Sequence, residues 1–428
     1  DFDIENTTVS ISETKKNVYI AIIIDEGDKY NFGDIKISGN FYPLQEESIF
    51  QNDIKTIKGE VFSRKLLNQS TESINQELGN YGYAFSNVNP IPDVDKNNLT
   101  VGFNYFIEPG KKVYVRRISF IGNERTQDKV LRREMRQFES SYYDQEKIDM
   151  SSRRLKRTQY FEGVDIKTVS VPGISDQVDL TVAVKEKNTG SVKLGAGASS
   201  DEGLVGSFSV TQANFLGTGN SVSATINTSS VNTIYQLSHV DPYFTPDGIS
   251  RRLTGYMKET NTKDLDTGQY DKKSYGLGVG FGIPMNEFDT VRIGFDADMS
   301  DITLVDSSPQ RYKDYCRDVS GGSNGGCDQN EVVLSVGYSS DKRDSAIYPR
   351  SGYKYDIGSE ITLPLLDMQY YQINAKVVDY LPLTKEFVWS NKLNLGYADS
   401  YGDDPYPFFQ NYYVGGSSSV RGYKAASI

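Results

Sequence analysis

Residues 291–299 read VRIGFDADM, and this stretch decides the fold class. Its odd-numbered positions are apolar and its even-numbered positions are Arg, Gly or Asp, a period of two that is typical of a β-strand with unlike faces. The same alternation returns over residues 275–281, 332–338 and 387–397. The polar positions carry mainly Gly, Ser, Asn and Asp with isolated Lys, whereas a soluble sandwich would carry many Lys and Glu. Such strands suit a barrel whose outer face meets lipid and whose lumen holds water.

The composition of the 428 residues fits such a barrel and excludes transmembrane helices. No run of 18 apolar residues occurs, and the mean hydropathy is -0.51. The chain has 30 Tyr, 20 Phe and 38 Gly, which is typical of barrel strands with aromatic girdles. The net charge of -11 argues against nucleic acid as a partner, because phosphate binding requires a basic face.

The sequence predicts no enzyme, cofactor or metal site. His239 is the single histidine, and its neighbour Ser238 would point to the opposite face of a strand. The two side chains therefore cannot form a nucleophile and its base. The sequence also has no Walker loop, dinucleotide fingerprint or cluster of metal ligands.

From residue 188 onward we expect eleven strands, with short turns alternating with longer loops, as in outer-membrane barrels. Cys316 and Cys327 flank the Gly-rich stretch 320–326 between the seventh and eighth of these strands. Two cysteines in one loop predict a disulfide formed in an oxidising compartment; two unpaired thiols in a mobile loop are the alternative.

Residues 1–187 differ from the remainder of the chain because they repeat. The tetrapeptide ISGN at 37–40 returns as FIGN at 120–123, and IDEG at 24–27 returns as IEPG at 107–110, both after 83 residues. Within a repeat the patterns predict the order strand, helix, helix, strand, strand. A helix pair on one face of a three-stranded sheet is the expected packing.

The fold class is therefore α+β modules of β-α-α-β-β order followed by an antiparallel transmembrane β-barrel. We expect residues 29–110 and 111–187 to be two modules and residues 188–428 to be the barrel. Residues 1–28 are expected to be the closing hairpin of an earlier module, so that the chain would begin within a repeat.

Two motifs carry a resemblance to a known family. Residues 420–423 read VRGY after the stretch GGSSS at 415–419, and residues 344–352 read DSAIYPRSG. Together with the module order they resemble the BamA family of outer-membrane barrel assembly factors, whose repeats are polypeptide-transport-associated (POTRA) modules. The resemblance covers essentially the whole chain and implies a barrel of about 16 strands, of which about 11 lie here.

The resemblance implies a function in the bacterial outer membrane, with the POTRA modules in the periplasm. A protein of this family assembles and inserts β-barrel proteins by strand addition at a lateral seam, after the modules hand over the substrate. It needs no cofactor, and its partners are unfolded outer-membrane proteins, assembly lipoproteins and the lipid bilayer. A two-partner-secretion pore is the main alternative, and a passive porin would leave the modules unexplained.

The resemblance also implies three groups of site residues. The first is the lumen-anchoring loop motif Val420, Arg421, Gly422 and Tyr423. Arg421 would pair with acidic groups on the lumen wall, since a water-excluded guanidinium needs a carboxylate; a solvated loop arginine is the alternative.

The second group is the lateral-gate strand: Ser191, Val192, Lys193, Leu194, Gly195, Ala196 and Gly197. Its exposed edge would accept a strand of the substrate, and the alternative is a glycine path that makes room for the loop. The third group is a partner-docking face on a helix expected over residues 129–139: Arg132, Arg133, Arg136 and Glu139. A solvated charged face is its alternative.

Overall fold

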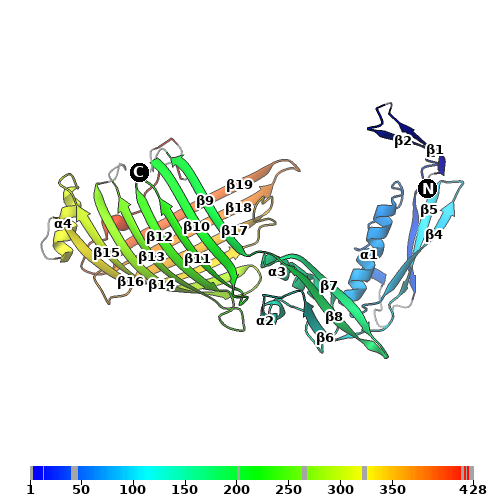
Figure 1. The fold of residues 1–428 in the computed structure, drawn as a ribbon, viewed down its shortest axis with the longest axis horizontal. Helices are drawn as coiled ribbons and strands as arrows, with labels where there is room; N and C mark the ends of the chain where they lie inside the picture. The colour runs from blue at the N-terminus through cyan, green and yellow to red at the C-terminus, as the bar shows by residue number, and fades with distance from the viewer. Residues whose placement is uncertain are drawn as a thin grey trace. The chain divides into compact units, whose positions relative to one another are not determined.

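The computed structural model describes residues 3–12, 14–39, 47–199, 203–262, 268–320, 325–415, 419–420 and 422–423 (Figure 1). The chain forms two compact units. The module unit comprises Asp1–Asn123 and Glu134–Glu186, and the barrel unit comprises Glu124–Arg133 and Lys187–Ile428.

The first module has a three-stranded sheet in the order β3 (Asn31–Gly39), β5 (Thr100–Glu108), β4 (Asn87–Asp95). β3 runs parallel to β5, and β4 runs antiparallel to it. Helix α1 (Arg64–Asn80) begins after Ser63, whose hydroxyl accepts the N–H of Leu66 and so caps the helix. One face of α1 buries Leu67, Ile74 and Leu78 in the apolar core of the module. Among the described residues, the first of the two helices expected in this module is a single turn, η1 (Glu47–Phe50).

The second module repeats the sheet as β6 (Tyr114–Ile121), β8 (Ile174–Glu186), β7 (Phe161–Val171). Its helix α3 (Gln145–Arg157) begins after Asp144, whose carboxylate accepts the N–H of Lys147 at 3.1 Å. The predicted order strand, helix, helix, strand, strand is confirmed in the second module, which runs β6, α2, α3, β7 and β8; in the first module the single turn η1 stands in the place of the first helix. The modules precede a large antiparallel sheet.

The helix predicted over residues 129–139 is wrong in length, because α2 spans only Asp128–Arg132. Beyond it the buried side chain of Gln137 donates to the carbonyls of Phe138 and Tyr142, at 3.2 and 2.9 Å. The Gln137 side-chain oxygen also accepts the N–H of Asp144 at 3.0 Å. These side-chain hydrogen bonds take the place of the backbone hydrogen bonds that a continuing helix would form. The chain therefore turns after Arg132 instead of continuing as a helix.

The repeated Gly of the two tetrapeptides has a steric cause. Gly39 has φ +132° and Gly122 has φ +85°, conformations that side chains rarely adopt. A Cβ at Gly39 would also strike the carbonyl oxygen of Ile107, and a Cβ at Gly122 that of Val184. Each module therefore needs a glycine at the end of its first strand.

The N-terminal residues form an antiparallel hairpin, β1 (Asp3–Ile11) with β2 (Val18–Asp25). The register shifts once, between Ile4 and Asn6. Apolar side chains of both strands are exposed, among them Val9 and Ile20, each at 63%.

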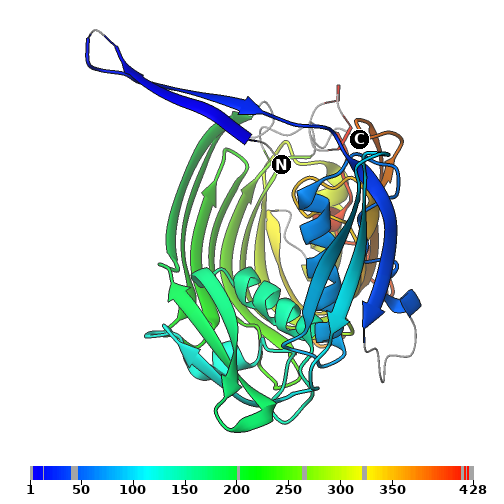
Figure 2. The same cartoon turned by 90° about the vertical axis from the view of Figure 1, so that its right-hand side faces the viewer.

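Eleven antiparallel strands form one sheet in the barrel unit, in unbroken chain order, which confirms the predicted strand count among the described residues. Figure 2 shows that this sheet curves into a barrel wall. The strands are β9 (Gly190–Ser199), β10 (Gly203–Phe215), β11 (Asn220–Thr228), β12 (Asn232–Asp241), β13 (Ser250–Asn261), β14 (Tyr270–Pro284), β15 (Asp289–Leu304), β16 (Gly326–Asp341), β17 (Gly352–Thr362), β18 (Tyr370–Pro382) and β19 (Val388–Ser400). A helix that was not predicted from the sequence, α4 (Gln310–Ser320), lies between β15 and β16.

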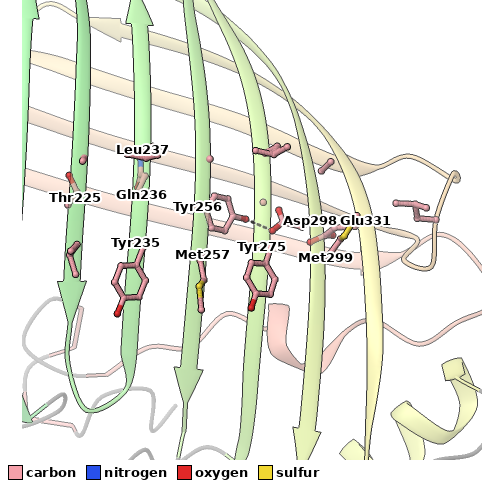
Figure 3. Close-up of a pocket in the computed structure, with 17 residues that line it drawn as sticks. Thr225, Tyr235, Gln236, Leu237, Tyr256, Met257, Tyr275, Asp298, Met299 and Glu331 are labelled. Atoms are coloured by element: carbon pink, nitrogen blue, oxygen red, sulfur yellow. Dashed lines mark hydrogen bonds between the residues drawn. The ribbon is translucent and has the colours of Figure 1, made fainter.

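The two faces of the wall differ as the alternation requires. Leu237, Gly255 and Leu277 are cross-strand neighbours on the apolar face. Tyr256 and Asp298 lie on the polar face, which faces the lumen, and the Tyr256 hydroxyl donates to the Asp298 carboxylate (Figure 3). Among the described residues, no helix is long and apolar enough to cross a membrane.

Candidate functional site

The first strand of the wall, β9, is an edge. It pairs with β10 from Gly190, opposite Gln212, to Ser199, opposite Gly203, without a register shift. Among the described residues it pairs with no other strand. The predicted lateral-gate residues all lie on this strand.

One hydrogen bond at the start of the ladder fixes which backbone groups face the free edge. The N–H of Ala213 donates to the carbonyl of Thr189 at 3.1 Å, and these residues are opposite one another in the same register. In an antiparallel ladder, residues at even spacing from such a pair also bond to the same neighbour. Gly195 and the other odd-numbered residues of β9 therefore bond to β10. The N–H and C=O of Val192, Leu194 and Ala196 point to the free edge.

The side chains of β9 add little to its pairing. Val192 is 66% exposed and Leu194 is 81% exposed on the apolar face. Gly195 and Gly197 have no side chain on the lumen face, and a Cβ at Gly197 would meet nothing within 4 Å. Since cross-strand side-chain pairs supply much of the stability of a sheet, β9 is weakly held to β10.

The last described strand, β19, is built differently. Trp389 lies opposite Leu381, and Leu393 lies opposite Val377. Large apolar pairs of this kind hold β19 to β18. β9 is therefore held to its neighbour less firmly than β19 is.

The segment after β19 lies against the polar face of the wall. The hydroxyl of Tyr412 donates to Asn374 at 2.8 Å, and the hydroxyl of Tyr406 accepts from Gln372 at 2.7 Å. Gln410 donates to the hydroxyl of Tyr370 at 2.9 Å. This segment was not predicted from the sequence, although its aromatic stretch PYPFFQNYY at residues 405–413 was a visible signal.

The loop motif begins shortly after this segment. Val420 and Tyr423 are exposed, at 39% and 58%, and the N–H of Tyr423 approaches the carbonyl of Val420 at 3.5 Å. Gly422 between them has φ +90°, a conformation suited to glycine. Arg421 lies outside the described residues, so its pairing with the lumen wall stays a prediction.

Acidic side chains are present on the polar face for such a pairing. Asp296, Asp298, Glu331 and Glu360 line a lumen cavity of about 320 Å³. Glu331 is 4% exposed and accepts a hydrogen bond from the hydroxyl of Tyr370 at 2.8 Å. Within the described ranges, no group of three or more His, Cys, Asp or Glu side chains could hold a metal ion.

The four predicted partner-docking residues do not share one helix. Arg132 is exposed at the end of α2, and Arg133 lies over the ring of Tyr243, 4.3 Å from its centre. Arg136 and Glu139 lie beyond the helix, and the Glu139 carboxylate accepts the N–H of Ile118 at 2.8 Å. Their role in docking stays a prediction, with Arg132 the most accessible of the arginines.

Residues 124–133 are fastened to turns of the barrel unit. The Asn214 side chain donates to the Thr126 hydroxyl at 2.8 Å, and the N–H of Gln127 donates to the carbonyl of Gly217 at 3.0 Å. Asn214 is 8% exposed. A segment that the sequence places within the second module is thus built into the base of the barrel.

The predicted disulfide is confirmed. Cys316 in α4 is bonded to Cys327 in β16, with their Cα atoms 5.2 Å apart. The bond joins the unexpected helix to the wall.

The free edges of the two modules differ in their backbone donors. β4 pairs with β5 without a break through Pro90 and Pro92, which have no N–H. Both prolines must therefore face the free edge, where they remove two alternate donors. The corresponding edge strand β7 reads FEGVDIKTVSV and has no proline.

The sheet of the second module carries an exposed ion pair. The Arg116 guanidinium donates to both carboxylate oxygens of Asp179, at 2.9 and 2.5 Å. The hydrogen bond from Arg116 lowers the pKa of Asp179 below its ordinary value. The pair ties β6 to its parallel neighbour β8.

Comparison with known sequences and structures gives consistent matches. A sequence model described as "Omp85 superfamily domain" matches residues 214–428, and one for POTRA, described as "Surface antigen variable number repeat", matches 30–110 and 113–187. The outer membrane protein assembly factor BamA of Neisseria meningitidis is 33% identical over 434 residues, which cover 100% of this chain and 54% of the relative. BamA of Buchnera aphidicola is 30% identical over 69% of this chain and 47% of the relative.

A solved structure agrees with these sequence matches. The crystal structure of BamA from Haemophilus ducreyi lacking POTRA domains 1–3 superposes with a TM-score of 0.78 at 31% identity. The superposition covers 93% of this chain and 76% of that one.

Proposed function

Because the chain belongs to the BamA family of the Omp85 superfamily, we propose that it assembles and inserts β-barrel proteins into the bacterial outer membrane. The chain is an outer-membrane protein with periplasmic POTRA modules. It spans about half the length of the curated relatives it matches, 54% of the Neisseria protein and 47% of the Buchnera protein.

The free edge of β9 is the observation that carries the proposal. Val192, Leu194 and Ala196 offer backbone donors and acceptors that a membrane interior would leave unpaired. When an unfolded client strand adds to this edge, the backbone hydrogen-bonding groups of both the client and β9 become paired. The small side chains of β9 allow the edge to open, because little packing is lost.

Strand lengths support a thin membrane at this edge. The first four strands, β9 to β12, have 10, 13, 9 and 10 residues, whereas β15 and β16 have 16 each. A shorter wall is expected to thin the bilayer beside it, which lowers the barrier to inserting a new strand. Insertion then draws on strand pairing and on the stability of the folded client.

The modules are proposed to hand over the client through β7 rather than β4. Pro90 and Pro92 remove two donors from the free edge of β4, so an added strand would leave its own carbonyls unpaired there. β7 keeps all of its donors. The assembly lipoproteins are proposed to contact the exposed Arg132.

The handover is tested with a photo-crosslinking residue at Val169 in β7 or at Val94 in β4. The two positions are matched, since both are valines with exposures of 47% and 50%. We expect a client adduct from position 169 and little from position 94. Equal adducts from both would contradict the role of the prolines.

The function itself is tested by folding a urea-unfolded client barrel into vesicles that contain the full-length protein. We expect faster appearance of the heat-modifiable folded client than in protein-free vesicles. No acceleration, together with large stable conductance, would instead indicate a secretion pore. The BamA proteins of Neisseria meningitidis and Buchnera aphidicola are named as assembly factors, which favours the first outcome.

A further inference from the structure

The proposed function leaves the disulfide-bonded segment between β15 and β16 without a role. This segment contains α4, and its two cysteines are buried, at 0% exposure for Cys316 and 6% for Cys327. They belong to an apolar cluster with Ile302 and Leu304 of β15 and with Phe408 from the segment after β19. The cluster therefore joins two loops that are far apart in the sequence.

Phe408 is enclosed by three tyrosine rings. Tyr312 stacks on it, with ring centres 3.8 Å apart and an angle of 14° between the planes. Tyr315 and Tyr270 meet the same ring edge-on, at 5.5 and 5.3 Å. Phe408 is 6% exposed as a result. We name Tyr270, Tyr312, Tyr315 and Phe408 the aromatic box.

Two of the four box residues come from α4, so the box depends on where that helix lies. Tyr312 and Tyr315 are three residues apart and share a helix face. Cys316 follows Tyr315 directly and is four residues from Tyr312, so the disulfide ties this part of the helix to β16. Upstream of the helix, the Ser308 hydroxyl donates to the carbonyl of Gln269 at 2.6 Å. α4 is thus fastened just before its first turn by Ser308 and within the helix by Cys316.

The box in turn holds the segment that leads to the loop motif. Phe408 begins the turn η2 (Phe408–Gln410), and Gln410 reaches Tyr370 on the lumen wall. The next residue, Phe409, lies under the ammonium group of Lys272, 4.1 Å from the ring centre. Hydrogen bonds orient the segment along the wall. The aromatic box fixes its position along the barrel axis, because it holds Phe408 beside α4.

We propose that α4 and its disulfide form a clamp that positions residues 401–415 against the lumen wall, and that the clamp holds only while the disulfide is intact. When the bond opens, α4 loses its covalent tie to β16. It keeps its Ser308 contact, and its other described bond to β16 is the single hydrogen bond from the Tyr315 hydroxyl to Gln329, at 3.1 Å. The two tyrosines can then leave Phe408, and the segment detaches. This clamp does not depend on the proposed assembly function.

The clamp is tested by chymotrypsin cleavage within residues 401–413 of the full-length protein, a stretch rich in Tyr and Phe. A dithiol reagent reduces the disulfide by giving it two electrons and two protons. Cys316 and Cys327 become thiols and the reagent becomes a cyclic disulfide. We expect cleavage to become about tenfold faster after reduction, because proteolysis follows the population of the opened segment. The double variant Cys316→Ser with Cys327→Ser should behave in the same way without any reagent.

Phe408→Ala tests the box with the disulfide intact. It should speed cleavage by a similar factor, and reduction should then add little, since both changes remove one shared contact. Phe387→Ala is the matched control, an exposed phenylalanine at 67% in the turn before β19, and should leave cleavage unchanged. Heat-modifiable gel migration shows whether each variant has a folded barrel.

Unchanged cleavage after reduction of a folded barrel would overturn the clamp. So would fully additive effects of Phe408→Ala and the cysteine variant. Client assembly is measured in the same proteins, which separates the two proposals. Lost assembly with unchanged cleavage refutes the clamp, whereas faster cleavage supports it at any level of assembly.

Discussion

Two adjacent residues of β9 allow a matched test of strand addition, because their N–H groups point in opposite directions. Gly195 bonds to Ser207 of β10, and Ala196 faces the free edge. Proline removes the N–H in either position and has the same backbone geometry in both. Gly195→Pro and Ala196→Pro therefore differ in which side of the strand loses a donor. Gly195→Pro also adds a Cβ 2.5 Å from the Ser207 hydroxyl oxygen, so that side chain must rotate away.

The expected magnitudes come from hydrogen-bond energies. Gly195→Pro removes a ladder bond, about 1 kcal/mol, and leaves the Ser207 carbonyl unpaired at a further cost of about 1 to 3 kcal/mol. Ala196→Pro loses no ladder bond, so the barrel itself should lose less than about 1 kcal/mol. A client strand at the edge then has one carbonyl without a donor, which costs about 2 kcal/mol, or roughly 30-fold in the equilibrium of strand addition.

The assay measures folding of a urea-unfolded client in vesicles, and heat-modifiable migration reports the state of the variant itself. Ala196→Pro should remain folded and assemble the client at least tenfold more slowly, whereas Gly195→Pro should weaken its own barrel. Ala196→Gly keeps the donor and serves as the control. A folded Ala196→Pro protein that assembles the client at the parent rate would refute the reasoning.

Three further predictions concern the modules. Ile74→Ala, at a residue with 0% exposure, should cost about 2 to 5 kcal/mol of unfolding free energy in a urea titration followed by tryptic cleavage of the module. Gly39→Ala should cost about 1 to 3 kcal/mol and reduce hydrogen-exchange protection of β3. Asp179→Asn should cost less than about 1 kcal/mol at pH 7, because the pair with Arg116 is exposed. The pKa of Asp179 is lower in the folded than in the unfolded protein, so the ionised carboxylate stabilises the fold above the unfolded pKa. This stabilisation is lost as pH falls through the folded pKa. The unfolding free energies of parent and variant, measured by urea titration, should therefore converge in acid.

The alternation of apolar and polar residues was sufficient to predict the wall. Strands such as residues 291–299 have one lipid-facing and one lumen-facing side, and neighbouring strands in chain order pair directly. The repeated tetrapeptides predicted the modules, since Gly39 and Gly122 hold conformations that other residues resist.

Sequence patterns failed where a contact from elsewhere in the fold decides the local structure. α2 ends at Arg132 because the buried side chain of Gln137 organises the next turn. α4 was missed within a loop, although Tyr312, Tyr315, Cys316 and Val319 have helical spacing. The aromatic box could not be predicted, because Phe408 meets α4 only through the curvature of the wall.

The direction of backbone groups along β9 also required the structure. Composition shows that the strand is rich in Gly and Ala, but the side of the strand that each N–H faces depends on the register with β10. Within that register, the hydrogen bond from the N–H of Ala213 to the carbonyl of Thr189 shows that the odd-numbered residues of β9 are the ones that bond to β10.

Photo-crosslinking from β9 to a stalled client tests the central claim most directly. A crosslinking residue at Leu194, which is 81% exposed, is compared with one at Leu277 in β14, which is 73% exposed and lies within the sheet. Strand addition at the edge predicts a client adduct from position 194 and none from position 277. The absence of an adduct from every position between 191 and 197, with the client stalled and the barrel folded, would contradict it.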